Sequence, residues 1–219
     1  MKPIRLRSSA AWIALCLPLA LGGCGVNTIP TKEETAKTAW ADVQSQYQRR
    51  SDLIPNLVST VQGYAAQERG VLVDVTKARA SATQVQVNAS TLTDPAAFQK
   101  YQAAQDNLSG VLGRLMVVNE KYPELKSNQN FLALQSELEG TENRISVARR
   151  DYNEAVRSYN TELRTFPGAL WAGTLYHDAK PMTLFAASQA AQSAPQVNFN
   201  IAPPGGAAPA VAPGSAPAK

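Results

Sequence analysis

Apolar side chains recur at alternating steps of three and four residues through the first half of the chain. This spacing places one apolar stripe along an α-helix. The stripe occupies Val43, Tyr47, Arg50, Ile54, Leu57, Val61, Tyr64, Glu68, Val71, Val75, Ala78, Ala82 and Val85. All of these positions except Arg50 and Glu68 are apolar or aromatic. A continuous helix over this series would run from Thr31 to Val87 and would be longer than any other predicted helix, so it either overhangs the bundle as a stalk toward the membrane or breaks.

Two more stripes follow, and each has its own start signal. Asp94 is a favourable N-cap and Pro95 suits the first position of a helix. Asn128 is a second favourable N-cap, and Pro167-Gly168 is a stop signal. The predicted helices are Pro95–Glu120, Asn128–Phe166 and a short one over Ala169–Tyr176.

The fold class follows from these lengths and from the short connections between them. Short loops between long helices place successive helices side by side and antiparallel. The sequence therefore predicts an all-α, up-and-down antiparallel helical bundle of three long helices plus a short terminal helix. Residues 187–219 are rich in Ala, Pro and Gly, and such a segment is predicted to be a disordered tail.

The stretch "RRSDLIPNL", from Arg49 to Leu57, interrupts the first predicted helix with a proline. Pro55 has no N–H to donate to the carbonyl of Ser51, and its ring crowds that carbonyl. A proline inside a helix costs about 3 kcal/mol. We therefore predict a kink or a break between Ser51 and Pro55.

The first residues form a targeting segment. A positive start (Lys2, Arg5, Arg7) precedes an apolar run from Ala10 to Leu21, which is too short to span a bilayer comfortably. The next residues, "LGGCG", resemble the bacterial lipobox, in which the cysteine is lipidated after cleavage before it. Cys24 is the predicted lipidation site. The alternatives are an ordinary signal peptide or an uncleaved anchor with an incidental cysteine.

This targeting segment determines the expected domain organisation and the expected location in the cell. The divisions are a signal peptide over 1–23, a lipidated cysteine and tether over 24–38, the bundle over 39–186 and the tail over 187–219. Gly25 replaces the aspartate that retains lipoproteins in the inner membrane of enteric bacteria. The expected location is the envelope of a Gram-negative bacterium, at the outer membrane facing the periplasm.

Charge argues against a nucleic-acid partner. The formal net charge is +4, and three of the positive residues fall in the targeting segment. Nucleic-acid binding needs a clustered basic face, and the rest of the chain is close to neutral.

Four charged residues fall on or beside the apolar stripes, namely Arg50, Glu68, Glu142 and Arg149. One interpretation is that they form satisfied pairs that set helix register, which is the best-attested role of such residues. The other is a polar binding site inside the bundle. In an up-down-up bundle the first and third helices run parallel, and aligning their starts brings Arg50 within reach of Glu142.

Catalytic and metal-binding patterns are missing from the sequence. The one histidine, His177, lies beyond the last long helix beside Asp178. No spacing typical of a metal site, a phosphate-binding loop or a nucleophile with its base occurs. We expect no catalytic residues, no metal and no cofactor.

Several long motifs together resemble the LemA family. They are "RRSDLIPNL", "YAAQE", "ARA", "EKYPELKSNQNFLALQSELEGTE" and "ARRDYNEAVRSYNTELRTFP". The resemblance covers about Trp40 to Phe185. It implies an all-α antiparallel bundle attached to a membrane, usually by an N-terminal transmembrane helix. This chain differs in having the candidate lipidated Cys24 in place of that helix.

Two functions remain from these observations. The first is a non-enzymatic scaffold or interaction protein of the periplasm, held at the membrane by Cys24 and binding a protein partner in the envelope. The second is a sensor that binds a small ligand or a peptide at a polar cluster. The candidate residues of that cluster are Arg49, Arg50, Asp52, Asn56, Glu68, Glu142 and Arg149.

Overall fold

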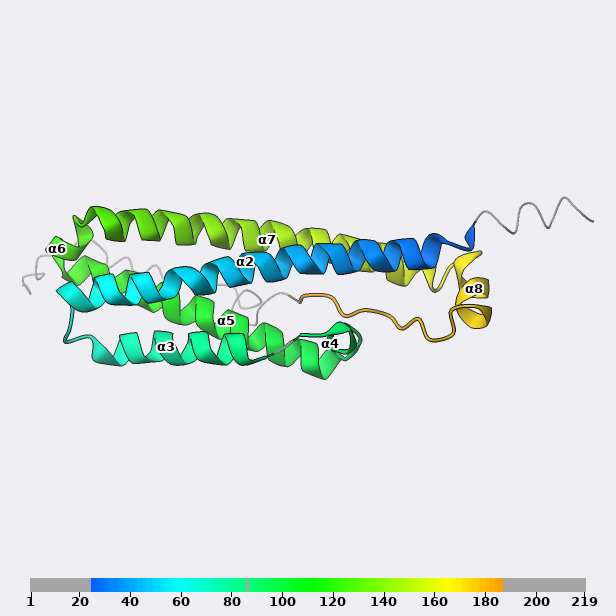
Figure 1. Ribbon diagram of the computed structural model, residues 1–219, viewed down its shortest axis with the longest axis horizontal. Coiled ribbons are helices and arrows are strands. Elements are labelled where there is room, and N and C mark those ends of the chain that lie inside the picture. The colour runs from blue at the N-terminus through cyan, green and yellow to red at the C-terminus, as the bar shows by residue number, and fades with distance from the viewer. Residues whose placement is uncertain (1–24, 86, 187–219) are drawn as a thin grey trace, which may run out of the picture. The chain divides into compact units, whose positions relative to one another are not determined.

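The computed structural model describes residues 25–85 and 87–186, and these form a bundle of helices (Figure 1). No strand occurs within these two ranges. The α-helices are α2 (Thr28–Tyr64), α3 (Arg69–Gln84), α4 (Ala89–Thr93), α5 (Pro95–Val118), α6 (Pro123–Lys126), α7 (Gln129–Glu162) and α8 (Gly168–Thr174), with a 3-10 turn η2 (Asn119–Lys121) before α6. The predicted all-α bundle is confirmed.

The bundle has four long helices because the first predicted helix is divided in two. Helix α2 ends at Tyr64, and α3 begins at Arg69 and runs back along it (Figure 1). The division adds one reversal of chain direction. Helices α2 and α7 are therefore antiparallel, and the expectation that they run parallel is wrong. Three contacts show this direction, because the residue numbers rise along α2 while they fall along α7: Lys32 with Glu162, Arg50 with Glu142, and Tyr64 with Asn128.

The predicted break at Pro55 is wrong, because α2 passes through this proline without interruption. The carbonyl that Pro55 leaves without its helical partner belongs to Ser51. The Nε of Arg79 in α3 donates a hydrogen bond to that carbonyl oxygen at 2.9 Å. A neighbouring helix thus supplies the donor that Pro55 lacks. The Ser51 carbonyl is satisfied, and much of the energetic cost of keeping α2 continuous is removed.

The break lies instead at residues 65–68. Ala65 has φ −132° and ψ 50°, outside the helical region, and its N–H bonds to the carbonyl of Val61. Ala65 itself is fully buried, so the turn is packed into the bundle. Turning here lets α3 lay its buried face, which includes Leu72 and Val75, against α5. A continuous helix would leave that face in water.

The starts of the next two long helices are confirmed. Oδ1 of Asp94 accepts from the backbone N–H groups of Ala96 and Ala97, and Pro95 is the first residue of α5. Oδ1 of Asn128 accepts from the backbone N–H of Phe131. Helix α7 ends at Glu162 and not at Phe166.

The N-terminal tether is shorter than expected. Helix α2 begins at Thr28, so most of the predicted tether over 24–38 is helical. Ile29 and Ala36 are buried against the rest of the bundle, which explains why this part of the chain folds. Cys24, the signal peptide over 1–23 and the tail over 187–219 lie outside the described residues.

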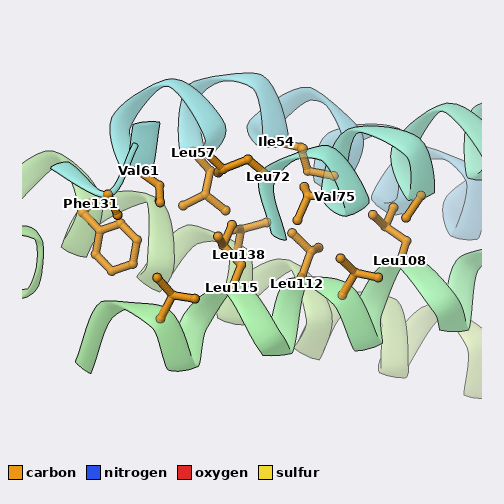
Figure 2. Packing of buried hydrophobic residues seen from close by; sticks show 14 of the residues in the cluster. Ile54, Leu57, Val61, Leu72, Val75, Leu108, Leu112, Leu115, Phe131 and Leu138 are labelled. Atoms are coloured by element: carbon orange, nitrogen blue, oxygen red, sulfur yellow. The ribbon is translucent and has the colours of Figure 1, made fainter. Parts of the chain in front are cut away.

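Two clusters of buried apolar side chains share the long helices. The aliphatic cluster joins the C-terminal part of α2 to α3, the C-terminal part of α5 and the start of α7 (Figure 2). It includes Ile54, Leu57, Val61, Leu72, Val75, Leu108, Leu112, Leu115, Phe131 and Leu138. The aromatic cluster includes Ile29, Trp40, Tyr47, Phe98, Tyr101, Tyr152, Tyr159, Met182 and Phe185.

None of the described helices combines the length and the hydropathy needed to cross a membrane.

Candidate functional site

A polar layer separates the two clusters. Along α2 it falls between Tyr47 of the aromatic cluster and Ile54 of the aliphatic cluster, at Arg50. Along α5 and α7 the two clusters are likewise separated by intervening polar positions. We define the polar layer as Arg50, Gln105, Ser109 and Glu142.

Arg50 is the centre of this layer and is only 1% exposed. Its Nη1 donates to Glu142 Oε1 at 2.5 Å and to Ser109 Oγ at 2.7 Å. Its Nη2 donates to Gln105 Oε1 at 2.7 Å. The guanidinium carbon also lies 5.0 Å from the centre of the Tyr47 ring, within the range of a cation–π contact. One residue of α2 thereby fixes the register of α5 and α7.

The pair of Arg50 and Glu142 is asymmetric. The Arg50 side chain is desolvated, whereas the Glu142 side chain is 43% exposed. Removing a charge from water is costly, and such a pair contributes little net stability while penalising any arrangement that separates it. This geometry agrees with the register-setting interpretation of these residues.

A cavity of about 340 Å³ opens beside the polar layer, between α2 and the helices α3 and α5. Tyr47, Ser51 and Gln105 are among its lining residues. The hydroxyls of Tyr47 and Ser51 are buried and have no hydrogen-bond partner within the described part of the chain. Buried polar groups are normally satisfied, so these hydroxyls can take water or a small polar molecule once a side-chain rotation exposes them to the cavity.

Burial raises the pKa of Tyr47 to about 12, although the nearby Arg149 and Arg50 act in the opposite direction. The Tyr47 hydroxyl is therefore neutral at physiological pH and can both donate and accept a hydrogen bond.

The other candidates on α2 lie away from this layer. Arg49 is exposed and pairs with Glu137 of α7 at 2.6 Å. Asp52 is exposed and accepts from Gln48 one turn earlier at 2.7 Å. The side chain of Asn56 is exposed as well. Of the candidates in "RRSDLIPNL", only Arg50 enters the bundle interior.

Glu68 and Arg149 are held in two further places. Glu68 sits in the turn before α3 and accepts from the Tyr122 hydroxyl at 3.1 Å. Arg149 pairs with Asp106 at 3.4 Å and lies over the ring of Phe185, 4.5 Å from its centre. The seven candidate residues therefore do not form one cluster. Arg50 and Glu142 are brought together, and the others serve separate contacts.

Residues 177–186, which we name the C-terminal strap, return from α8 along the bundle without regular secondary structure. Asn160 donates to the carbonyl of Met182 at 2.8 Å and accepts from its N–H at 2.9 Å. Asn153 makes the same pair of bonds with Phe185, at 3.1 and 2.9 Å. The two side-chain amides act like a neighbouring strand for the strap.

Sequence reasoning did not predict the contacts of three sets of residues. Gln105 interrupts the apolar stripe of its helix, and that interruption was a signal for the polar layer. The repeated Tyr-Asn pair at 152–153 and 159–160 was a signal for the strap, since its seven-residue spacing keeps both asparagines on one helix face. Arg79 lies in the motif "ARA", but nothing local connects it with Ser51.

Acidic, histidine and cysteine side chains do not gather into a metal-binding group anywhere in the described ranges. His177 and Asp178 contact each other at 3.4 Å and both are exposed.

The sequence model of the LemA family matches residues 39–199, which is more than half of the chain. Among curated relatives, the chain is 26% identical over 157 residues to "Magnetosome protein MamQ 2" of Paramagnetospirillum magneticum, covering 64% of this chain and 58% of that protein. It is 24% identical over 157 residues to "Magnetosome protein MamQ" of Magnetospirillum gryphiswaldense, with the same coverage.

A third relative is "Protein LemA" of Metamycoplasma hominis, which is 23% identical over 140 residues. That match covers 64% of this chain and 60% of the relative. The chain thus spans less than two thirds of the length of the curated relatives that it matches.

Proposed function

The chain belongs to the LemA family, and on that premise we propose that it is a non-enzymatic scaffold held at a membrane of the bacterial envelope. Its bundle would bind a protein partner, and its anchor would keep that partner at the membrane surface. No nucleic acid takes part.

The proposed anchor is an acylated Cys24. The apolar run from Ala10 to Leu21 and the sequence "LGGCG" support it. Each buried CH₂ of an acyl chain contributes about 0.8 kcal/mol, so several chains hold a protein firmly. Gly25, in place of the aspartate that retains lipoproteins in the inner membrane, supports a location at the periplasmic face of the outer membrane in a Gram-negative cell.

The observation that carries the scaffold proposal is how the polar residues of the long motifs are used within the bundle. Arg50, Glu142 and Arg79 hold helices together, while Asn153 and Asn160 hold the C-terminal strap. Their polar groups are engaged in packing rather than aimed at a substrate. An interaction role then falls to exposed residues such as Asp52 and Asn56.

The anchor is tested by mass spectrometry of the N-terminal peptide of the mature chain. We expect a peptide that begins at residue 24 and carries the added mass of acyl chains, and a Cys24→Ser variant should lack that mass. An unmodified Cys24 in the wild-type chain would contradict the proposed anchor.

The scaffold role is tested by photo-crosslinking in cells from positions 52 and 56, one at a time. We expect the same foreign protein from both positions, and a control crosslinker at Lys77 on α3 should not capture it. Crosslinks only to α7 of the same chain would indicate that this segment of α2 packs only within the bundle and would contradict a partner site there.

A ligand sensor is the second candidate, and the cavity beside the polar layer is the observation in its favour. About 340 Å³ falls within the size range of small-molecule sites, and its lining includes Tyr47 and Ser51, whose buried hydroxyls have no partner among the described residues. A ligand that binds only the folded state raises the melting temperature.

The sensor is tested by thermal unfolding in the presence of free amino acids and dipeptides as probes. A rise in melting temperature that disappears in Ser51→Ala and Tyr47→Phe, but remains in Thr60→Ala, would support it. No rise in melting temperature with any probe would contradict the sensor and would indicate that the cavity holds only water.

A further inference from the structure

Exposed apolar side chains gather at the end of the bundle where the described chain begins. Phe166 is 86% exposed, Leu170 is 52% exposed and Leu175 is 59% exposed. These three lie within ten residues, whereas the other large apolar side chains exposed in the described ranges are spread over α2, α3, α5, α7 and the C-terminal strap. We name these three residues, of which Leu170 lies in α8 and the other two flank it, the α8 apolar face. A monomer in water gains nothing from such a concentration.

The N-terminus of the described chain packs directly beside this face. Gly25 is buried, and a Cβ added to it would lie 2.9 Å from Cγ of Pro167 and 3.6 Å from Nε1 of Trp171. Helix α2 then leaves from Thr28 toward the other end of the bundle (Figure 1). The segment that precedes Gly25 therefore joins the bundle at α8.

That preceding segment is apolar in sequence, and it includes Cys24 one residue before Gly25. Consecutive Cα atoms are about 3.8 Å apart, so an acyl chain attached one residue before Gly25 would start close to Pro167 and Trp171, at this end of the bundle. An uncleaved apolar segment would emerge at the same end. Either anchor would bring α8 close to the lipid.

Charge near the face also suits a bilayer. Arg164 and Lys180 are exposed, and neither pairs with a carboxylate of the described residues. Three acidic residues lie nearby, and each has a partner: Asp178 contacts His177, Glu162 pairs with Lys32 and Glu33 pairs with Lys37. Basic side chains beside an apolar surface favour the headgroups of anionic lipids.

We propose that the α8 apolar face inserts Phe166, Leu170 and Leu175 into the lipid surface beside the anchor and so holds the bundle upright on the membrane. Three side chains bind a bilayer weakly by themselves. The anchor raises their effective concentration at the lipid, and docking then becomes an intramolecular step. This proposal rests on the proposed membrane anchoring and adds a second contact to it.

The upright arrangement places the opposite end of the bundle far from the lipid. Helix α2 has 37 residues, which gives a length of about 55 Å at 1.5 Å per residue. Helices α6 and α8 lie at opposite ends (Figure 1). The turn before α3 and the segment around α6 would then be presented to partners well above the membrane.

The test uses the full chain, purified from membranes and reconstituted into vesicles of phosphatidylethanolamine and phosphatidylglycerol that contain acyl-brominated lipid. Bromine quenches tryptophan fluorescence only at short range. Leu170→Trp places a reporter in the face, and Val117→Trp is the matched control; the quenching of the unsubstituted chain, which has Trp40 and Trp171, is subtracted from both. Val117 is 62% exposed and lies at the end of α5 next to η2.

We expect at least a twofold larger loss of fluorescence for Leu170→Trp than for Val117→Trp. Adding Phe166→Asp to Leu170→Trp should remove most of that difference. Far-UV circular dichroism of each variant checks that the bundle is folded. Equal quenching of the two reporters would overturn the proposal.

Mass spectrometry of the same preparation separates this result from the state of the anchor. Acylated Cys24 with equal quenching would overturn the face alone, whereas unmodified Cys24 with strong Leu170→Trp quenching would overturn the acyl anchor and support the face. If the reporters are quenched equally and Phe166→Asp abolishes self-association in analytical ultracentrifugation, the face is an interface between two copies.

Discussion

The aliphatic and aromatic clusters share α2, α5 and α7 but are completed by different parts of the chain. The aliphatic cluster is closed by α3, whose apolar residues follow a helical period. The aromatic cluster is closed by the C-terminal strap, which contributes Met182 and Phe185 without a helix of its own. One half of the bundle is therefore sealed by periodic packing and the other by side-chain amides that bind an extended chain.

The difference extends to how the side chains pack. Trp40 lies 5.3–5.9 Å, centre to centre, from four other aromatic rings, which include Tyr152 and Phe185. Aromatic pairs at such distances prefer particular angles, whereas aliphatic side chains interdigitate with less directional preference. The aromatic half should thus be more sensitive to any single change.

High pH should separate the two clusters most strongly. Burial raises the pKa of Tyr47 and of Tyr159 to about 12, and it also raises the pKa values of Tyr101 and Tyr152. Unfolded tyrosine ionises near pH 10, so the folded state holds these protons more tightly. The resulting stability is fully present below about pH 10 and is lost as the pH rises through about 12.

A titration followed by near-UV circular dichroism should show this loss. Tyrosinate absorbance should rise together with the disappearance of the aromatic signal, and Tyr47→Phe should shift the transition upward. Full tyrosine ionisation with an unchanged near-UV spectrum would argue against burial of the tyrosine hydroxyls as the cause.

Trp40→Ala should cause the largest loss among single substitutions. Removing a large buried aromatic side chain costs about 3–5 kcal/mol. Leu57→Ala in the aliphatic cluster is the matched comparison and should cost about 2–5 kcal/mol, toward the lower end if aliphatic packing relaxes more easily. Urea unfolding measured by far-UV circular dichroism gives both values.

Both variants should unfold in one transition, since α2, α5 and α7 pass through both clusters. Two separated transitions in Trp40→Ala alone would show that the clusters fold independently of each other.

Glu142→Ala tests the layer between the clusters. Removing one partner of a buried pair costs about 3–5 kcal/mol, but Glu142 is partly exposed, and water can solvate the remaining charge in part. We expect a loss of about 1.5–3 kcal/mol, typical of a hydrogen bond to a charged group. Glu139→Ala, on the same helix and exposed, should change stability by about 0.5 kcal/mol or less.

A second substitution makes the test specific. Arg50→Met in the Glu142→Ala background should recover part of the loss, because it removes the uncompensated buried charge. Further destabilisation by the same size as in the wild-type background would mean that the two residues act independently.

Asn160→Ala should loosen the aromatic half without affecting the aliphatic half. It deletes two hydrogen bonds to Met182, each contributing about 0.5–1.5 kcal/mol. Amide hydrogen exchange measured by NMR should speed up at Met182 and Thr183 and stay unchanged at Leu115. Asn143→Ala, exposed on the same helix, should leave all these rates alone.

The smallest effect concerns the proline in α2. Arg79→Met should destabilise the bundle by about 1 kcal/mol, because the Ser51 carbonyl loses its donor. In a Pro55→Ala background the restored N–H of residue 55 can donate a hydrogen bond to the Ser51 carbonyl. The loss of stability caused by Arg79→Met should then shrink toward zero. An unchanged cost in the double-mutant cycle would remove Arg79 as the reason that α2 is continuous.

Local signals along the chain specify the helices and many of their starts. Apolar spacing of three and four marked the buried faces, and Asp94 with Pro95 and Asn128 marked helix starts. Each of these signals acts within a few residues, so it can be recognised without knowing the rest of the fold. The predicted contact between Arg50 and Glu142 is present, but the parallel alignment of helices from which it was predicted is wrong.

Packing between distant parts of the chain decides where the first helix turns, which helices are antiparallel and what covers the aromatic cluster. Pro55 is a strong local break signal, but a donor from another helix compensates it. The turn at 65–68 carries no comparable signal, and the burial of α3 against α5 favours it. These outcomes depend on contacts between residues far apart in sequence, whose free energies appear only once the helices are packed.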